Sequence, residues 1–151
     1  MAFVGRLFAI AAILAMVLGF VRWPQPATGF WTITVKNRAY GLGWDYLAFS
    51  LGAFFALFAA LYYWFPIVFS HTLSERMSQA HFSLSALAAA SVLLLAPGLQ
   101  ALTTTRAAAT RSDAAFASVV IILISCVLFL VAQGIFVTIV FWAFWKSSAK
   151  S

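Results

Sequence analysis

The sequence predicts an all-α membrane protein with four transmembrane helices, and three observations lead to this class. Hydrophobic residues make up 65% of the 151 residues and charged residues 8%, whereas soluble domains are about half apolar and a quarter charged. The mean hydropathy is +1.04. The apolar residues form four runs, each able to supply the roughly 20 residues that cross a hydrocarbon core. No region is long and polar enough for a soluble domain, so we expect a single membrane domain over residues 1–151.

The first span is expected over residues 3–21. A charge precedes its apolar stretch, as in a secretory signal peptide. However, the stretch is long for a signal sequence, and no small-x-small cleavage pattern precedes the aromatic segment that follows. That segment, residues 22–45, contains two prolines, three tryptophans and the β-like stretch WTITV. Because aromatic rings favour the headgroup level, we expect an ordered interfacial loop here.

Three further spans are expected over residues 46–69, 81–102 and 114–145. The polar stretches SHTLSERMSQA and TTTRAAATRSD are predicted to be the loops between them. At 1.5 Å per residue the last span would be about 48 Å long, so it must tilt or project from a core about 30 Å thick. Small residues in the second and third spans predict close helix packing in lipid. They are Ser50, Gly52, Ala53, Ala56, Ala59, Ala60, Ser83, Ser85, Ala86, Ala88, Ala89, Ala90 and Ser91.

The net charge of +6 does not indicate a nucleic-acid partner, because the nine basic residues are scattered among loops and ends. Lipid headgroups and partner subunits explain them better. Charge does not decide the orientation either. With the N-terminus inside, four basic residues lie inside and five outside, so the positive-inside rule is indecisive. The inner set is Arg6, Arg76, Lys146 and Lys150, and the outer set is Arg22, Lys36, Arg38, Arg106 and Arg111.

Few side chains could carry chemistry. The acids Asp45, Glu75 and Asp113 all lie at span ends or in loops, and no two of them share a helix face. General acid–base catalysis and a proton relay therefore have no visible carrier. Cys126 is the single cysteine and lies within an apolar run, where we expect a small packing residue.

Each remaining polar residue has a structural interpretation beside a functional one. His71 is expected to be solvated and His81 to cap or hydrogen-bond at a helix start, with metal ligation as the alternative. Asp45 is expected to face the positive end of a helix dipole, with proton transfer as the alternative. Glu75 and Arg76 are expected to form a solvated loop pair. The uncharged polar residues are expected to be interhelical hydrogen-bond partners rather than channel lining: Gln100, Ser125, Gln133 and Thr138.

The segment FSLGAFFALFAALYYWFP, residues 49–66, resembles the tenth transmembrane helix of subunit I of haem-copper oxidases, where LSMGAVFAIFAGFYYWFP is usual. After Pro66, Glu75 and the pair His81-Phe82 match the family pattern YYWFP, eight residues, E, five residues, HF. RSDAAFASVVIILISCVLFLVAQGIF is similar to the family's last helix. Arg106 and Arg111 lie in the loop where the family carries an arginine pair near the haem propionates. The resemblance covers nearly the whole chain and implies helices nine to twelve of a twelve-helix subunit.

The same alignment departs from the family at its metal positions. The two helix-ten histidines that bind the haem irons in the family fall on Trp44 and Tyr46, and the His-Asp pair of its magnesium site falls on Lys36 and Asn37. An indole has no lone pair to donate to iron, and a lysine replaces a metal ligand with a positive charge. The resemblance thus implies a chain that binds neither haem in the family's way. We expect no catalytic, cofactor-binding or metal-binding residue in it and no bound cofactor.

The resemblance implies a non-catalytic accessory subunit of a respiratory terminal oxidase (cytochrome oxidase) complex or supercomplex, and not an enzyme by itself. Its expected partners are other respiratory subunits and lipids, in the bacterial cytoplasmic membrane or the mitochondrial inner membrane. Two alternatives stay open: the C-terminal piece of a split subunit I that completes a catalytic subunit, and a small transporter or assembly factor. Under the family's topology the N-terminus and residues 70–80 face the cytoplasm or matrix, and residues 22–45 face the opposite side.

Overall fold

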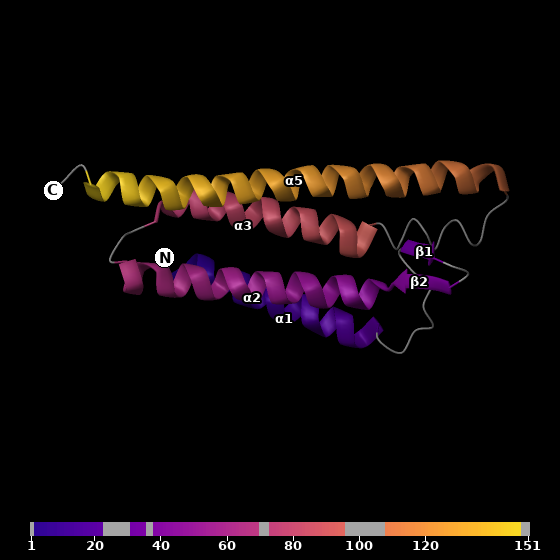
Figure 1. Cartoon of the computed structure of the whole chain (residues 1–151), viewed down its shortest axis with the longest axis horizontal. Coiled ribbons are helices and arrows are strands. Elements are labelled where there is room, and N and C mark those ends of the chain that lie inside the picture. The colour runs from indigo at the N-terminus through magenta and orange to yellow at the C-terminus, as the bar shows by residue number, and fades with distance from the viewer. Residues whose placement is uncertain (1, 23–30, 36–37, 70–72, 96–107, 149–151) are drawn as a thin grey trace. The chain divides into compact units, whose positions relative to one another are not determined.

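The computed structural model describes residues 2–22, 31–35, 38–69, 73–95 and 108–148. Within these ranges the chain forms long helices and one β-hairpin (Figure 1). Four of the helices are long and apolar enough to cross a membrane. The prediction of a helical membrane protein with four spans is therefore confirmed.

The chain divides into two compact units, and the boundary lies within the second long helix. One unit comprises Ala2–Trp64 and the other Phe65–Ser151. Each unit contains a pair of packed helices. The contacts within one pair differ in kind from the contacts within the other.

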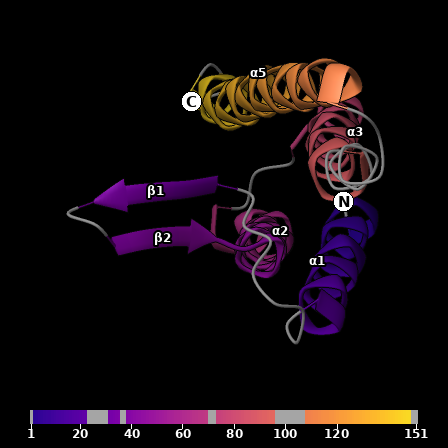
Figure 2. The same cartoon turned by 90° about the vertical axis from the view of Figure 1, so that its right-hand side faces the viewer.

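The first unit contains helix α1, Ala2–Arg22, the strands β1, Trp31–Val35, and β2, Arg38–Leu42, and most of helix α2, Trp44–Phe69. The strands pair in antiparallel register, with Trp31 opposite Leu42 and Val35 opposite Arg38. Figure 2 shows the resulting ribbon leading into α2. The segment expected to be an interfacial loop thus contains a hairpin, and its first strand is the β-like stretch WTITV.

Aromatic packing and close backbone approach join α1 to α2. The ring of Phe8 stacks on Tyr62 with centroids 5.5 Å apart and also contacts Phe55 and Phe58 at 5.9 Å and 5.6 Å. Gly52 lies where a Cβ atom would come within 2.7 Å of Met16 Cγ and 3.2 Å of the Ala12 carbonyl oxygen. A glycine is required here because the backbones meet too closely for a side chain.

The second unit contains α3, Glu75–Ala90, the π-helical turn η1, Ser91–Leu95, and α5, Ala108–Ser148. The third span was expected to begin at His81, and the structure corrects this, because α3 begins at Glu75. Ser74 has the extended conformation of an N-cap, and the carboxylate of Glu75 suits the positive end of the helix dipole. Much of the polar stretch expected to be a loop is therefore the first turns of the helix.

The π turn η1 has a chemical reason in the sequence. Pro97 follows two residues after η1, and a proline offers no amide hydrogen to the preceding turn and crowds the carbonyl four residues before it. The π turn from Ser91 to Leu95 lies just before this proline in the sequence, where such crowding is expected. In α2, by contrast, Pro66 lies inside the helix, which continues to Phe69.

Helix α5 is the longest element of the chain. It has 41 residues and begins before the expected start at residue 114. At 1.5 Å per residue it is about 62 Å long, well beyond a hydrocarbon core of about 30 Å. Its apolar span, Val119–Lys146, has 28 residues. The expectation that the last helix is too long to cross the bilayer upright is thus confirmed.

Candidate functional site

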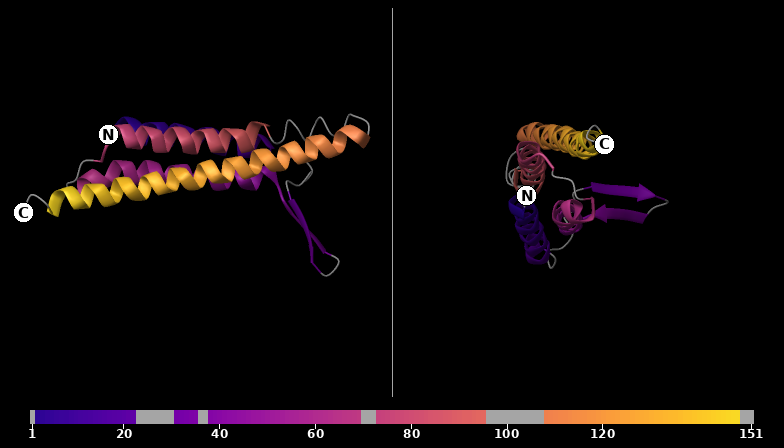
Figure 3. Two further views of the ribbon diagram at one scale, coloured as in Figure 1. Left: turned by 90° about the horizontal axis from the view of Figure 1, so that it is seen from above. Right: turned by 90° about the vertical axis from the view of Figure 1, so that its left-hand side faces the viewer.

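Helices α3 and α5 pack side by side in antiparallel directions, along a seam of mostly small side chains (Figures 1 and 3). On α3 the buried side chains recur every three or four residues: Ser78, His81, Ser85, Ala88 and Ala89. On α5 the buried side chains are Ser125, Ala132, Ile139 and Ala143. Small residues at this spacing bring two helices close together in lipid, where dispersion and polar contacts must hold them.

His81 is the one large polar side chain on the buried face of α3. It is 0% exposed, and its ring centroid lies 5.3 Å from that of Phe136 on α5. The imidazole is also hydrogen-bonded to the side chain of Gln133. Because the Nε2 atom of Gln133 has no partner, the amide carbonyl accepts this bond and an imidazole N–H donates it.

The sequence-based expectations for this pair are met in part. His81 was expected at a helix start, but it lies in the second turn of α3, because the helix begins earlier. Gln133 was expected to bond between helices, and its bond to His81 confirms this. An ionisable side chain buried between membrane helices is costly, so its position marks this seam as the candidate functional site.

Ser85 lies one turn after His81 and completes the polar cluster. Its side chain is 0% exposed, and its Oγ has no hydrogen-bond partner among the described residues. The Nε2 of Gln133 is buried in the same way. The seam therefore holds unused hydrogen-bonding capacity, and each such group costs about 1–3 kcal/mol of stability.

Other hydroxyl groups in the spans bond to their own helices instead. Ser125 Oγ donates to the Ile121 carbonyl oxygen at 2.7 Å, and Thr138 Oγ1 donates to that of Gly134 at 2.8 Å. The expectation that Ser125 and Thr138 bond between helices is therefore wrong. A hydroxyl can satisfy itself on the carbonyl four residues earlier, which needs no partner helix. Gln100 lies outside the described residues.

The residues at the family's haem-ligand positions lie in the first turn of α2. Trp44 begins the helix, and Asp45 follows in the first turn, as expected for a carboxylate at the positive end of the dipole. The side chain of Tyr46 is 61% exposed. Lys36, Asn37, His71 and Arg106 lie outside the described residues, and the side chain of Arg111 does too.

The other chemistry-bearing residues are dispersed. Glu75 and Arg76 open α3 rather than forming a loop pair. Cys126 is exposed on α5, and so it does not fill the packed interior as expected. Among the described residues, no three His, Cys, Asp or Glu side chains come together as a metal site would require. The structure joins His81 to Gln133, and Ser85 is buried on the same face of α3 as His81.

The arrangement at the seam can make hydrogen bonds between helices away from water. It joins an imidazole, an amide and a hydroxyl, and aromatic and small apolar side chains surround them. No protein-family model and no solved structure matches this chain.

Proposed function

We propose that this chain is a non-catalytic structural subunit of a respiratory terminal oxidase complex or supercomplex. The proposal depends on the resemblance of residues 49–66 to helix ten of haem-copper oxidase subunit I and on the spacing to His81-Phe82. The observation that carries its non-catalytic part is the identity of Trp44 and Tyr46, which stand where the resemblance puts the two haem-ligand histidines.

The chemistry of these positions supports a structural role. The indole of Trp44 offers iron no lone pair, and Tyr46 lacks the imidazole that the family uses, so neither haem could be held by histidine from this helix as in the family. His81 does not replace the missing imidazoles, since it is buried in the α3–α5 seam and bonded to Gln133. A subunit of this kind contributes packing and leaves the haem chemistry to other chains.

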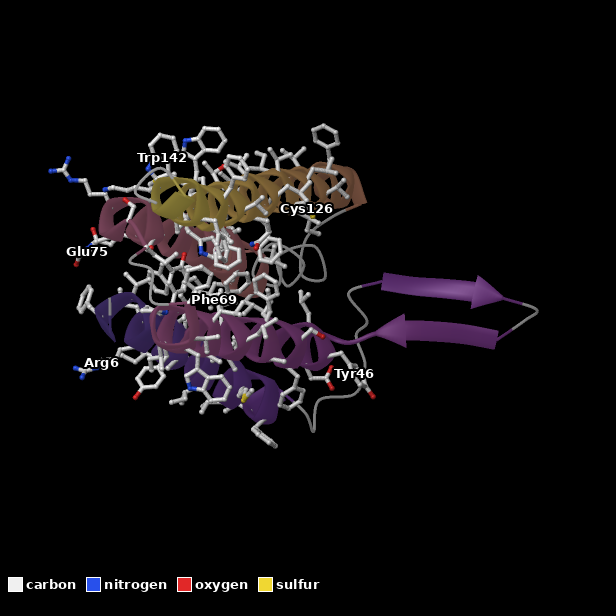
Figure 4. All side chains as sticks on the ribbon, turned by 60° about the vertical axis from the view of Figure 1, so that its left-hand side comes forward. Arg6, Tyr46, Phe69, Glu75, Cys126 and Trp142 are labelled. Atoms are coloured by element: carbon white, nitrogen blue, oxygen red, sulfur yellow. The ribbon has the colours of Figure 1, made fainter. Side chains whose placement is uncertain are left out.

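The exposed surface of α5 is consistent with binding to partner helices within the membrane. Many large apolar side chains on this helix are exposed, among them Leu130, Val137, Phe141 and Trp142. Figure 4 shows Trp142 projecting from α5 on the side away from α3. Lipid chains and the helices of other subunits are the two surroundings that such a face accepts in a membrane.

The test is to purify the tagged chain in a mild detergent and to identify the proteins that remain bound. We expect oxidase subunits in fixed stoichiometry, among them a chain with its own helix-ten histidines, and a normal haem spectrum for the complex. A double variant, Trp44→Phe with Tyr46→Phe, should leave that spectrum unchanged. The matched control replaces the helix-ten histidines of the partner subunit, which should abolish the haem signals.

Two other outcomes would replace the proposal. A two-haem oxidase in which no other chain supplies helix ten would make this chain part of a split catalytic subunit. Recovery of the chain without any oxidase subunit would favour a transporter or an assembly factor. Either result is read from the same purification, because the subunit list and the haem spectrum are recorded together.

A further inference from the structure

The position of α5 along the membrane normal is not fixed by the bilayer. Its apolar span, Val119–Lys146, has 28 residues and is about 42 Å long, whereas the hydrocarbon core is about 30 Å thick. The surplus of about 12 Å exceeds the length of seven helical residues, about 10.5 Å. A shift of α5 by one heptad would therefore still leave apolar residues across the whole core.

The small residues of the seam do not fix the position of α5 either, because they repeat every seven residues. Ser125 and Ala132 are two such small residues, and the larger Ile139 follows seven residues later. Phe129 and Phe136 have the same spacing. If α5 moved by one heptad, Phe129 would take the place of Phe136 and Ser125 that of Ala132, so these contacts would re-form, while Ala132 would take the place of the larger Ile139.

Gln133 is the residue that has no equivalent in the shifted register. The residue seven positions earlier is Cys126, whose thiol is a weak hydrogen-bond partner. In that register the imidazole of His81 would lose its amide partner while still buried, and an unsatisfied buried polar group is costly. The native register is thus the one in which the imidazole of His81 has its amide partner.

We infer that His81 and Gln133 form a polar lock that sets the axial register of α5 against α3. A single polar residue specifies register in the same way in coiled coils whose apolar seam fits several alignments. The first unit needs no such device, since Phe8 fits among Phe55, Phe58 and Tyr62 and Gly52 admits the α1 backbone. The lock does not rest on the proposed respiratory role, because both of its residues belong to this chain.

Disulfide cross-linking of the full chain tests the lock in a Cys126→Ala background. Counting along the antiparallel helices from His81 and Phe136, Ser85 lies level with Ala132 in the native register and with Ser125 after a shift of one heptad. Ser85→Cys with Ala132→Cys therefore reports the native register, and Ser85→Cys with Ser125→Cys reports the shifted one. Oxidation in membranes and gel analysis give the ratio of shifted to native cross-link.

The variants His81→Phe and Gln133→Leu should each raise this ratio about threefold or more, given the strength of hydrogen bonds between membrane helices. His81→Gln, which can still bond to Gln133, should restore the native ratio. The matched control is Ser78→Ala, because Ser78 is buried on the same face but donates to the Ser74 carbonyl oxygen of its own helix. It should leave the ratio unchanged.

Two results would overturn the lock. One is an unchanged ratio in both His81→Phe and Gln133→Leu. The other is loss of the native cross-link in His81→Gln to the same extent as in His81→Phe, which would show that the seam needs the imidazole for its shape. If His81→Phe prevents both cross-links, restoration in His81→Gln would still support the lock, since only hydrogen bonding is regained.

Discussion

Single residues decide how closely the helices of this chain approach, and Gly52 is the clearest case. A Cβ atom there would lie 3.2 Å from the Ala12 carbonyl oxygen and 3.3 Å from the Met16 nitrogen, and backbone atoms cannot move aside as a side chain can. We expect Gly52→Leu to reduce the free energy of unfolding by about 1–3 kcal/mol, the usual range for overpacking. Unfolding in mixed micelles with increasing denaturing detergent, followed by circular dichroism, would measure it.

The matched control for this prediction is Gly134→Leu. Gly134 also lies within a membrane helix, but a Cβ atom there would meet nothing within 4 Å. The substitution adds apolar surface to an exposed position and should not lower the stability. Equal losses in the two variants would show that the effect of leucine does not depend on the close approach of α1.

The polar residues of the seam could be predicted from the sequence only in part. Gln133 was recognisable as an interhelical partner because an amide in an apolar run must find one. The identity of that partner was not, since His81 lies far away in sequence and the antiparallel alignment must be known first. Ser85 gave a weaker signal: Ser78, His81, Ser85 and Ala88 recur every three or four residues, which marks one helix face. Whether a serine bonds to its own helix, as Ser125 does, is not readable from the sequence.

At the scale of elements, the two helix pairs differ in what stabilises them. The bond between His81 and Gln133 joins α3 to α5. A double-mutant cycle with His81→Phe and Gln133→Leu should give a coupling free energy of about 0.5–1.5 kcal/mol, the range found for polar contacts between membrane helices. Each single variant should lower the free energy of unfolding by more than the coupling free energy, because it leaves the other polar group buried without a partner.

The control for this cycle is the pair Ser125→Ala and Gln133→Leu. Ser125 is buried on the same side of α5, but its hydroxyl bonds to Ile121 of its own helix. Its coupling to Gln133 should be near zero. A coupling between His81 and Gln133 no larger than this would mean that the seam is held by dispersion alone.

The pair of α1 and α2 should depend instead on one aromatic side chain. Phe8 is 0% exposed and contacts three aromatic rings of α2. We expect Phe8→Ala to cost about 2–3 kcal/mol. This is below the usual range for phenylalanine truncation, because separated helices remain in an apolar solvent and only the cavity term is lost. Phe3, which is 57% exposed on the same helix, is the comparison: Phe3→Ala should change the unfolding free energy by less than about 0.5 kcal/mol.

The start of α3 shows which element boundary the sequence did not predict. The stretch SERMSQA was expected to be a loop because it is polar, but it forms the first turns of a helix. Polarity predicts where a helix leaves the hydrocarbon, and not where it ends, since a helix can continue among headgroups and water. The capping pattern of Ser74 followed by Glu75 was the available signal. The strand WTITV was easier to recognise, because threonine, isoleucine and valine favour extended backbone.

For the whole molecule, the four spans were the most predictable feature, since apolar length alone identifies them. The grouping of the chain into two units, Ala2–Trp64 and Phe65–Ser151, was not predictable. Every span is apolar enough to face lipid, so hydropathy does not tell which helices pack together. In the structure, aromatic packing joins α1 to α2, whereas small side chains and the bond between His81 and Gln133 join α3 to α5.

The topology of the whole chain follows from the number of crossings and can be tested directly. If all four candidate helices span the membrane, Arg6, Ser74 and Lys146 lie on one side and the β-hairpin lies on the other. Single cysteines at these three positions, in a Cys126→Ala background, should react with a membrane-impermeant maleimide from the same face of sealed vesicles. Ala39→Cys in β2 should react only from the opposite face, and all four should react after detergent is added. Labelling of Ser74→Cys and Lys146→Cys from opposite faces would mean that either α3 or α5 does not cross. If α5 were the helix that does not cross, its long apolar span would have to lie along the surface, where its all-round apolar character would be left unburied.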